Sequence, residues 1–302
     1  MPALALALVC LLLLAACGDG SATKGDVVAV GTTTQVGDFL REVGGRRADV
    51  RQILRANSDP HGYEPRPSDV RALAAADLVV RSGGEMDDWL DGLVDDAGSG
   101  APVLDLSTVV RTRRRDGELD PHWWQDPRNA ERAVVAIRDG LAKADPAGAP
   151  RYRGNAARYL ARLARLDRDT AACIDRIPPT RRKLVTTHDA LGYYADRYGL
   201  EVIGAVIPSL STQAQPSARD VQALVSQIRR AGVRAIYPES SINPKLERAV
   251  ARESGASVGG ALWADTLGQP GSNGATYVES VRSNTRAIAA GLSGAALSCP
   301  AG

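Results

Sequence analysis

The 302-residue chain contains only three histidines, and each stands at the edge of a predicted turn or strand. His61 and His122 both end an Asp-Pro-His tripeptide, and His188 directly follows the strand-like residues 183–187. Neutral imidazole suits zinc, copper, iron and nickel as a ligand. We therefore expect the three histidines to converge on one metal ion.

Two carboxylates also follow strand-like segments, Glu239 after residues 235–237 and Asp265 after residues 261–263. Open α/β sheets bind ligands beyond the carboxyl ends of their strands, so two facing sheets would collect these groups in one cleft. Three imidazoles and one carboxylate form a four-coordinate set that zinc accepts. The spacing alone also allows each histidine to be an ordinary loop residue.

Strand-like and helical segments alternate along the first half of the chain, which predicts a parallel sheet covered by helices. Ser68 is predicted to cap one of these helices, and Asp126 with Pro127 to begin another. The predicted strands are residues 26–32, 48–54, 77–81 and 102–106, and the predicted helices are a short one through Phe39 and residues 67–76, 86–93 and 127–143.

Residues 151–177 contain no proline and only one glycine, and their apolar side chains recur at three- and four-residue spacings. A helix of this length spans about 40 Å. We interpret residues 148–178 as a rigid connector, the alternative being one more packing helix. The second half repeats the alternation, with strands at residues 184–187, 202–207, 234–237 and 257–263 and helices at residues 216–230, 243–253 and 276–292.

Together these patterns predict an α/β fold of two lobes, each a mostly parallel sheet flanked by helices, joined by one long rigid connecting helix. The lobes are expected at residues 26–147 and 179–302. The hydrophobic fraction of 44% and charged fraction of 24% are those of a globular protein. The net charge of +2 does not favour nucleic acid, and the basic residues 111–115 are expected to form a solvated loop.

The N-terminal segment has the pattern of an export signal. Residues 3–16 form an apolar segment that is too short to span a membrane, and small residues precede Cys17, as in the bacterial lipobox. We expect residues 1–17 to be a lipoprotein signal peptide, Cys17 to carry lipid and residues 18–25 to be a flexible tether. No Lys or Arg precedes the apolar segment. The alternatives are a plain secretory signal and a buried helix.

Four cysteines occur in the chain. Cys10 would leave with the signal peptide and Cys17 would be lipidated. Cys173 and Cys299 then remain as an even pair in an oxidising compartment, which favours a disulfide between the C-terminal tail and the long helix. Two free thiols are the alternative.

Five segments, in this order, resemble the zinc- and manganese-binding solute-binding lipoproteins of bacterial ABC metal importers, the metal-binding cluster A family. The resemblance covers nearly the whole mature chain. The segments are residues 59–69, residues 120–127, residues 187–190 with Tyr193 and Tyr194, residues 237–241 and residues 263–267.

This resemblance implies that His61, His122, His188 and Asp265 are the metal ligands. It places Glu239 near the metal, either beside a ligand or as an alternate carboxylate ligand. The implied function is capture of zinc, or less favourably manganese, in the cleft between the lobes and delivery to a permease driven by a cytoplasmic ATPase. The implied receptor is a monomer, is not an enzyme, and is held at the outer face of the cell membrane by its lipid.

Two comparisons within the family bear on the choice of metal. Its manganese-binding members carry a carboxylate where His188 stands, which favours zinc here. Many zinc-specific members carry a His-rich acidic loop before the second ligand, but residues 111–118 are basic and contain no histidine.

Two other classes of function remain open from the residues alone. A zinc hydrolase would keep three protein ligands and an open water position, whereas a fourth ligand at Asp265 would close the site. A receptor for haem or a metal chelate would need an aromatic or Arg-rich cleft, and the single phenylalanine of the chain does not favour one.

Overall fold

The computed structural model describes residues 27–294, 297 and 299. Its N-terminal lobe is built on a four-stranded parallel sheet in the order β2-β1-β3-β4. Val27, the first residue described, lies beside Ala48 in this sheet. The strands are β1 (Val27–Gly31), β2 (Ala48–Gln52), β3 (Leu78–Arg81) and β4 (Val103–Asp105).

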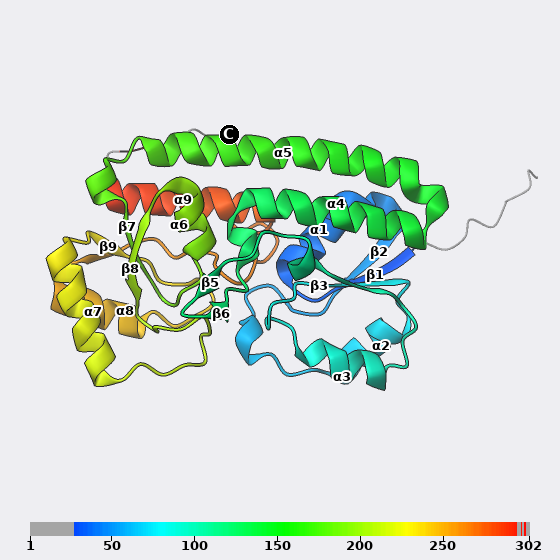
Figure 1. Ribbon diagram of the computed structural model, residues 1–302, viewed down its shortest axis with the longest axis horizontal. Coiled ribbons are helices and arrows are strands. Elements are labelled where there is room, and N and C mark those ends of the chain that lie inside the picture. Colours follow the sequence, from blue (N-terminus) through cyan, green and yellow to red (C-terminus); the bar gives the residue numbers. More distant parts are fainter. Residues whose placement is uncertain (1–26, 295–296, 298, 300–302) are drawn as a thin grey trace, which may run out of the picture.

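Alternate side chains of the central strands enter two different cores. Ala29 and Val80 face a core formed with α1 (Thr34–Gly44) and α4 (Pro127–Ala144). Val30 and Val79 face a second core formed with α2 (Pro67–Ala74) and α3 (Trp89–Asp96). Helices therefore cover both faces of the sheet, as expected for parallel strands (Figure 1).

The C-terminal lobe contains two parallel strand pairs, which a parallel bridge between Thr186 and Tyr237 brings together. One core packs against α7 and α8, and another packs against α6 and α9. The elements are β7 (Lys183–Thr186), β8 (Glu201–Ala205), β9 (Ala235–Ile236), β10 (Ser257–Val258), α6 (Gly192–Tyr198), α7 (Ala218–Ala231), α8 (Lys245–Ser254) and α9 (Tyr277–Ser293).

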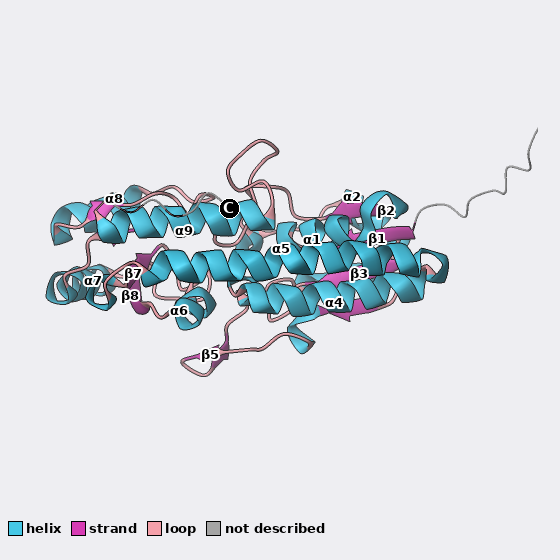
Figure 2. Ribbon diagram, turned by 90° about the horizontal axis from the view of Figure 1, so that it is seen from above, coloured by secondary structure: helices cyan, strands magenta, loops and turns pink. Residues whose placement is uncertain are grey.

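The long helix α5 (Ala149–Asp175) joins the lobes. Its side chains from Tyr152 to Leu166 lie in the N-terminal core, whereas Cys173 and Ile174 lie in the C-terminal core. Helix α9 divides in the same way, with Val281 in the first core and Ile288 in the second. Figure 2 shows α5 and α9 side by side, so two helices rather than one form the spine. The predicted two-lobe α/β fold with a long joining helix is confirmed.

Some local predictions are wrong. Arg66, not Ser68, is the N-cap of α2, and its N–H donates to the Asp69 carboxylate at 2.7 Å. The strand expected at residues 257–263 is reduced to β10 and one bridge at Leu262. Short elements that the pattern did not predict, besides α6, are β5 (Arg114–Arg115), β6 (Glu118–Leu119), η1 (Gly45–Arg47), η2 (Pro60–Gly62), η3 (Leu106–Thr108), η4 (Trp123–Gln125), η5 (Pro146–Gly148) and η6 (Pro179–Arg181).

A disulfide joins Cys173 on α5 to Cys299, with the two Cα atoms 5.3 Å apart. The predicted signal peptide, Cys17 and the tether lie outside the described residues. Within the described part of the chain, no helix has both the length and the apolar character needed to cross a membrane.

Candidate metal centre

The repeated Asp-Pro-His tripeptide forms the same local turn twice. Asp59 accepts the N–H of His61 at 2.9 Å, and Asp120 accepts the N–H of His122 at 3.0 Å. This side-chain-to-backbone bond two residues along is typical of Asx turns. Each turn leads into a short 3-10 segment, so the sequence itself holds these two histidines in defined loops.

The four predicted ligands come together from the two lobes. His61 and His122 follow strands of the N-terminal lobe, whereas His188 and Asp265 belong to the C-terminal lobe. One potential ligand atom from each lies within 4.8 Å of the others. The Asp265 carboxylate is 3.1 Å from Nε2 of His61, 3.1 Å from Nε2 of His188 and 3.4 Å from Nε2 of His122.

The cluster is almost completely withdrawn from solvent. The side chains of His122, His188 and Asp265 are at most 1% exposed, and that of His61 is 9% exposed. Both carboxylate oxygens of Asp265 and Nε2 of His61 are buried without an aligned hydrogen bond. Buried polar atoms normally have partners. Three imidazole nitrogens and a carboxylate that face one point match the donor set of a tetrahedral metal ion.

A carboxylate stands behind each of two histidines. Asp120 Oδ1 is 2.8 Å from Nδ1 of His122, and Glu239 Oε2 is 3.0 Å from Nδ1 of His188. Such partners orient a metal-binding imidazole and direct its other nitrogen at the metal. Of the two positions expected for Glu239, the geometry therefore favours the one beside a ligand.

The charges around His188 favour a cation at the centre of the site. Burial acts to lower the pKa of His188, but the carboxylates of Asp265 and Glu239 outweigh it and raise that pKa well above its usual range. Burial and the charge of Asp265 raise the pKa of Glu239. Burial acts to raise the pKa of Asp265, but the imidazoles of His188 and His122 hold it well below its usual range.

A basic strap formed by residues 111–119 lies between the lobes and includes the antiparallel β5–β6 hairpin (Figure 1). Arg113 donates to Asp120 at 2.6 Å and to Asp196 of α6 at 3.0 Å. Arg115 forms an ion pair with the buried Asp189, next to His188. The expectation of a solvated loop is therefore wrong for these two arginines.

Further hydrogen bonds hold the lobes closed around the site. The carbonyl of Ala264, next to Asp265, accepts from Nε1 of Trp124 at 2.9 Å and from Nε2 of Gln125 at 2.7 Å. On the side of His61, a pocket of about 320 Å³ adjoins the cluster. Its lining includes the carboxylate residues Glu85, Asp88 and Glu118.

Sequence reasoning missed the functional contacts of Asp120, Arg113 and Arg115. The repetition of Asp-Pro-His was a signal for Asp120, because both tripeptides place an acid two residues before the imidazole. Nothing in the basic segment indicated which arginines would reach the other lobe.

Comparison with known proteins finds relatives that match nearly the whole described chain. The model of the family ZnuA, described as "Zinc-uptake complex component A periplasmic", matches residues 28–291. Manganese-binding lipoprotein MntA of Bacillus subtilis is 32% identical over 292 residues, which cover 92% of this chain and 95% of the relative. High-affinity zinc uptake system protein ZnuA of Paracoccus denitrificans is 30% identical over 293 residues, 84% of this chain and 88% of the relative.

The fold matches solved structures over most of its length. The periplasmic zinc binding protein TroA from Treponema pallidum superposes with a TM-score of 0.82 at 28% identity, covering 89% of this chain and 99% of TroA. The long helix between two α/β lobes is thus a shared architecture. The chain belongs to the ZnuA family, the metal-binding receptors of ABC importers.

Proposed function

We propose that this receptor captures Zn²⁺, with Mn²⁺ as the alternative, through His61, His122, His188 and Asp265 in the cleft between its lobes. The observation that carries the proposal is the convergence of four potential ligand atoms within 4.8 Å at a buried point. Each lobe contributes two of the four residues. Metal bound there would hold the lobes together, and their separation would release it.

Zinc is preferred because of the donor set. Three nitrogens and one oxygen favour the later metals of the Irving–Williams series, whereas manganese suits oxygen ligands. Named relatives include both manganese-binding and zinc-uptake proteins. The choice of metal for this chain therefore rests on His188. Its imidazole stands where the manganese-binding members of the family are expected to carry a carboxylate.

Delivery to an ABC permease and its ATPase follows from membership of the family. The proposal extends to a monomer that turns over no substrate, because four protein ligands complete a tetrahedral shell and leave no position for reactive water. It also includes residues 1–17 as signal peptide, lipidation of Cys17, residues 18–25 as tether and anchoring at the outer face of the membrane. The lobes are proposed at residues 26–147 and 179–302, with residues 148–178 between them.

Elemental analysis of protein purified without added metal tests the proposal. We expect one zinc per chain in the wild type and loss of zinc in separate His61→Ala and Asp265→Asn variants. An exposed carboxylate on α4, changed in Asp139→Asn, serves as the control and should leave zinc unchanged. Stoichiometric zinc in the His61→Ala and Asp265→Asn proteins would place the metal elsewhere.

A further inference from the structure

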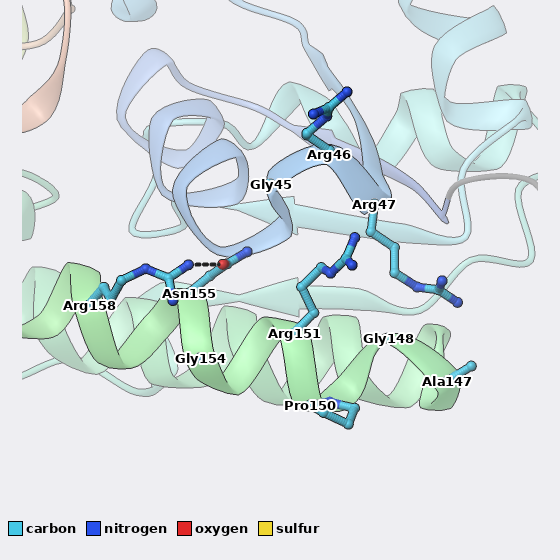
Figure 3. A pocket seen from close by; sticks show the side chains of 10 residues that line it. All are labelled: Gly45, Arg46, Arg47, Ala147, Gly148, Pro150, Arg151, Gly154, Asn155 and Arg158. Carbon is cyan, nitrogen blue, oxygen red and sulfur yellow. Dashed lines mark hydrogen bonds between the residues drawn. The ribbon is translucent and has the colours of Figure 1, made fainter.

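A cationic pocket of about 960 Å³ lies far from the metal centre, between η1 and the first turns of α5. Four of its ten lining residues are arginines, and none of the ten is acidic. Figure 3 shows Arg151 reaching from α5 toward the segment that carries Arg46 and Arg47. Arg158 stands about two helical turns further along α5, beside Asn155.

The walls of this arginine pocket are fixed by specific contacts. Arg47 donates to both oxygens of Asp145, at 2.5 and 2.9 Å, and Tyr152 donates to the same carboxylate at 2.8 Å. Asn155 donates to the carbonyl of Val43 at 2.9 Å, which ties α5 to the end of α1. The charge of Arg47 is therefore neutralised by Asp145, and this arginine has a structural role.

The other three arginines keep their charge available. Arg46, Arg151 and Arg158 are exposed, and none has an acidic partner within the described residues. Arg158 donates only to the neutral amide of Asn155. The planar guanidinium group presents paired N–H donors that match phosphate oxygens. Three such groups around one hollow, with no carboxylate in its lining, suit a ligand that carries phosphate.

The position of the arginine pocket indicates the source of that phosphate. Arg46 and Arg47 directly precede Ala48, which pairs with Val27 at the start of β1. Ten residue steps separate Val27 from Cys17. Even a fully extended segment of that length reaches only about 35 Å. If Cys17 carries lipid, as proposed above, the arginine pocket is confined to the neighbourhood of the membrane surface.

We propose that this arginine pocket binds the phosphate groups of anionic phospholipids and so seats the N-terminal lobe on the membrane. The arginine pocket lies at one end of the long axis, at the start of α5, whereas the metal site lies between the lobes (Figure 1). Seating on lipid therefore leaves the metal cleft accessible. The interaction is electrostatic and weakens as the salt concentration rises.

Vesicle co-sedimentation of the chain from residue 18 onward tests this without an acyl anchor. Every helix and strand of the two lobes lies after residue 26, so this chain contains the whole described fold. We expect it to bind vesicles that contain phosphatidylglycerol and not vesicles of phosphatidylcholine alone. Because each arginine near an anionic surface strengthens binding roughly fivefold, the triple variant Arg46→Gln/Arg151→Gln/Arg158→Gln should bind roughly a hundredfold more weakly.

A matched triple variant, Arg219→Gln/Arg230→Gln/Arg248→Gln, removes the same charge from exposed positions of α7 and α8 in the other lobe. It should keep most of the binding. An equal loss in the two triple variants would mean that net charge alone is sensed and would overturn the proposal. Binding of inorganic phosphate without binding of vesicles would also overturn the assignment to lipid.

Two further measurements distinguish lipid binding at the arginine pocket from zinc binding in the cleft. The triple lysine variant, Arg46→Lys/Arg151→Lys/Arg158→Lys, should retain vesicle binding because it retains the charge, and loss of binding in a folded lysine variant would contradict a charge-driven contact. Zinc binding, measured on the same proteins, should be unchanged in all variants. Vesicle binding without zinc binding would refute the metal function alone, and zinc binding without vesicle binding would refute the lipid site alone.

Discussion

Arg113 and Asp120 form an ion pair at 2.6 Å directly behind the proposed metal ligand His122. Asp120 in turn meets Nδ1 of His122 at 2.8 Å, and the same guanidinium reaches Asp196 of the other lobe at 3.0 Å. One arginine therefore connects the orientation of an imidazole with the closure of the two lobes. We therefore expect Arg113 to act as a positioning residue for metal retention.

Removing this guanidinium should weaken metal binding and speed metal release. We expect Arg113→Ala to raise the zinc dissociation constant about tenfold, the lower end of the effect seen for partners of metal-binding imidazoles. Arg114, the next residue, is exposed and donates only to the carbonyl of Gly117, so Arg114→Ala is the matched control. Competition with a fluorescent chelator measures both affinity and release rate. If the two variants had the same zinc affinity and the same release rate, Arg113 would not be a positioning residue.

A glycine on α6 offers an independent test of the same contact. A Cβ at Gly192 would collide with the guanidinium of Arg113. We expect Gly192→Ala to displace the arginine while keeping its charge, and to accelerate zinc release as Arg113→Ala does. Stopped-flow release measurements compare the two, and the double variant should be no faster than either single one. Additive acceleration would indicate separate causes.

His188 should determine the preference between zinc and manganese. His188→Glu replaces a nitrogen donor by oxygen and should lower the ratio of zinc affinity to manganese affinity. The carboxylate of Glu239, 3.0 Å from His188 Nδ1, would then oppose a second carboxylate, so both metals should bind less tightly. Adding Glu239→Gln should restore part of the manganese affinity. Isothermal titration at one pH gives the six dissociation constants, for two metals on each of three proteins, and an unchanged ratio would exclude His188 as a ligand.

The disulfide should contribute strongly to stability because it closes a long loop. Cys173 and Cys299 are 126 positions apart, and loss of such a crosslink costs about 2–5 kcal/mol. Cys173→Ala/Cys299→Ala should therefore lower the melting temperature by roughly 5–15 °C. Reductant should lower the melting temperature of the wild type but leave the double variant unaffected. A reductant-insensitive wild type would show that the crosslink is absent in solution.

Asp38 should make stability depend on pH below neutrality. Burial raises the pKa of Asp38 to about 6, although it accepts hydrogen bonds from the Tyr277 N–H at 3.1 Å and the Tyr159 hydroxyl at 3.2 Å. The folded-state pKa of Asp38 lies above its unfolded-state value of about 3.9. Protonated Asp38 therefore contributes its full stabilisation below pH about 3.9, and this stabilisation is lost as the pH rises through about 6.

Asp38→Asn should remove this dependence. Relative to the wild type, its free energy of unfolding should increase by up to about 3 kcal/mol between pH 4 and pH 6.5, because one pKa unit corresponds to about 1.4 kcal/mol. Urea denaturation with a chelator present, at both pH values, measures the difference. Asp139→Asn, at an exposed carboxylate, should show no such change. If the difference in unfolding free energy between Asp38→Asn and the wild type were the same at both pH values, the raised pKa of Asp38 would be contradicted.

The sequence by itself indicated most of the longer helices and strands and the candidate metal donors. Residues 151–177 are helical in pattern because apolar side chains recur at helical spacing, and that periodicity does not depend on distant contacts. The turns at His61 and His122 are equally local, since an aspartate two residues earlier forms each one. The scarcity of histidine, with three in 302 residues, favoured a metal site, although the spacing alone also allowed each histidine to be an ordinary loop residue.

Only the tertiary structure decided which polar groups meet. The sequence left Glu239 as either a ligand or a neighbour, and the packing of β9 beside β7 sets it behind His188. Arg113 and Arg115 resemble the solvated Arg114 in sequence, yet they pair with carboxylates of the other lobe. Helix α9 joins the spine for the same reason, since its two halves contact different cores. Side-chain periodicity reports burial within one element, whereas contacts between the lobes depend on how the two cores are placed against each other.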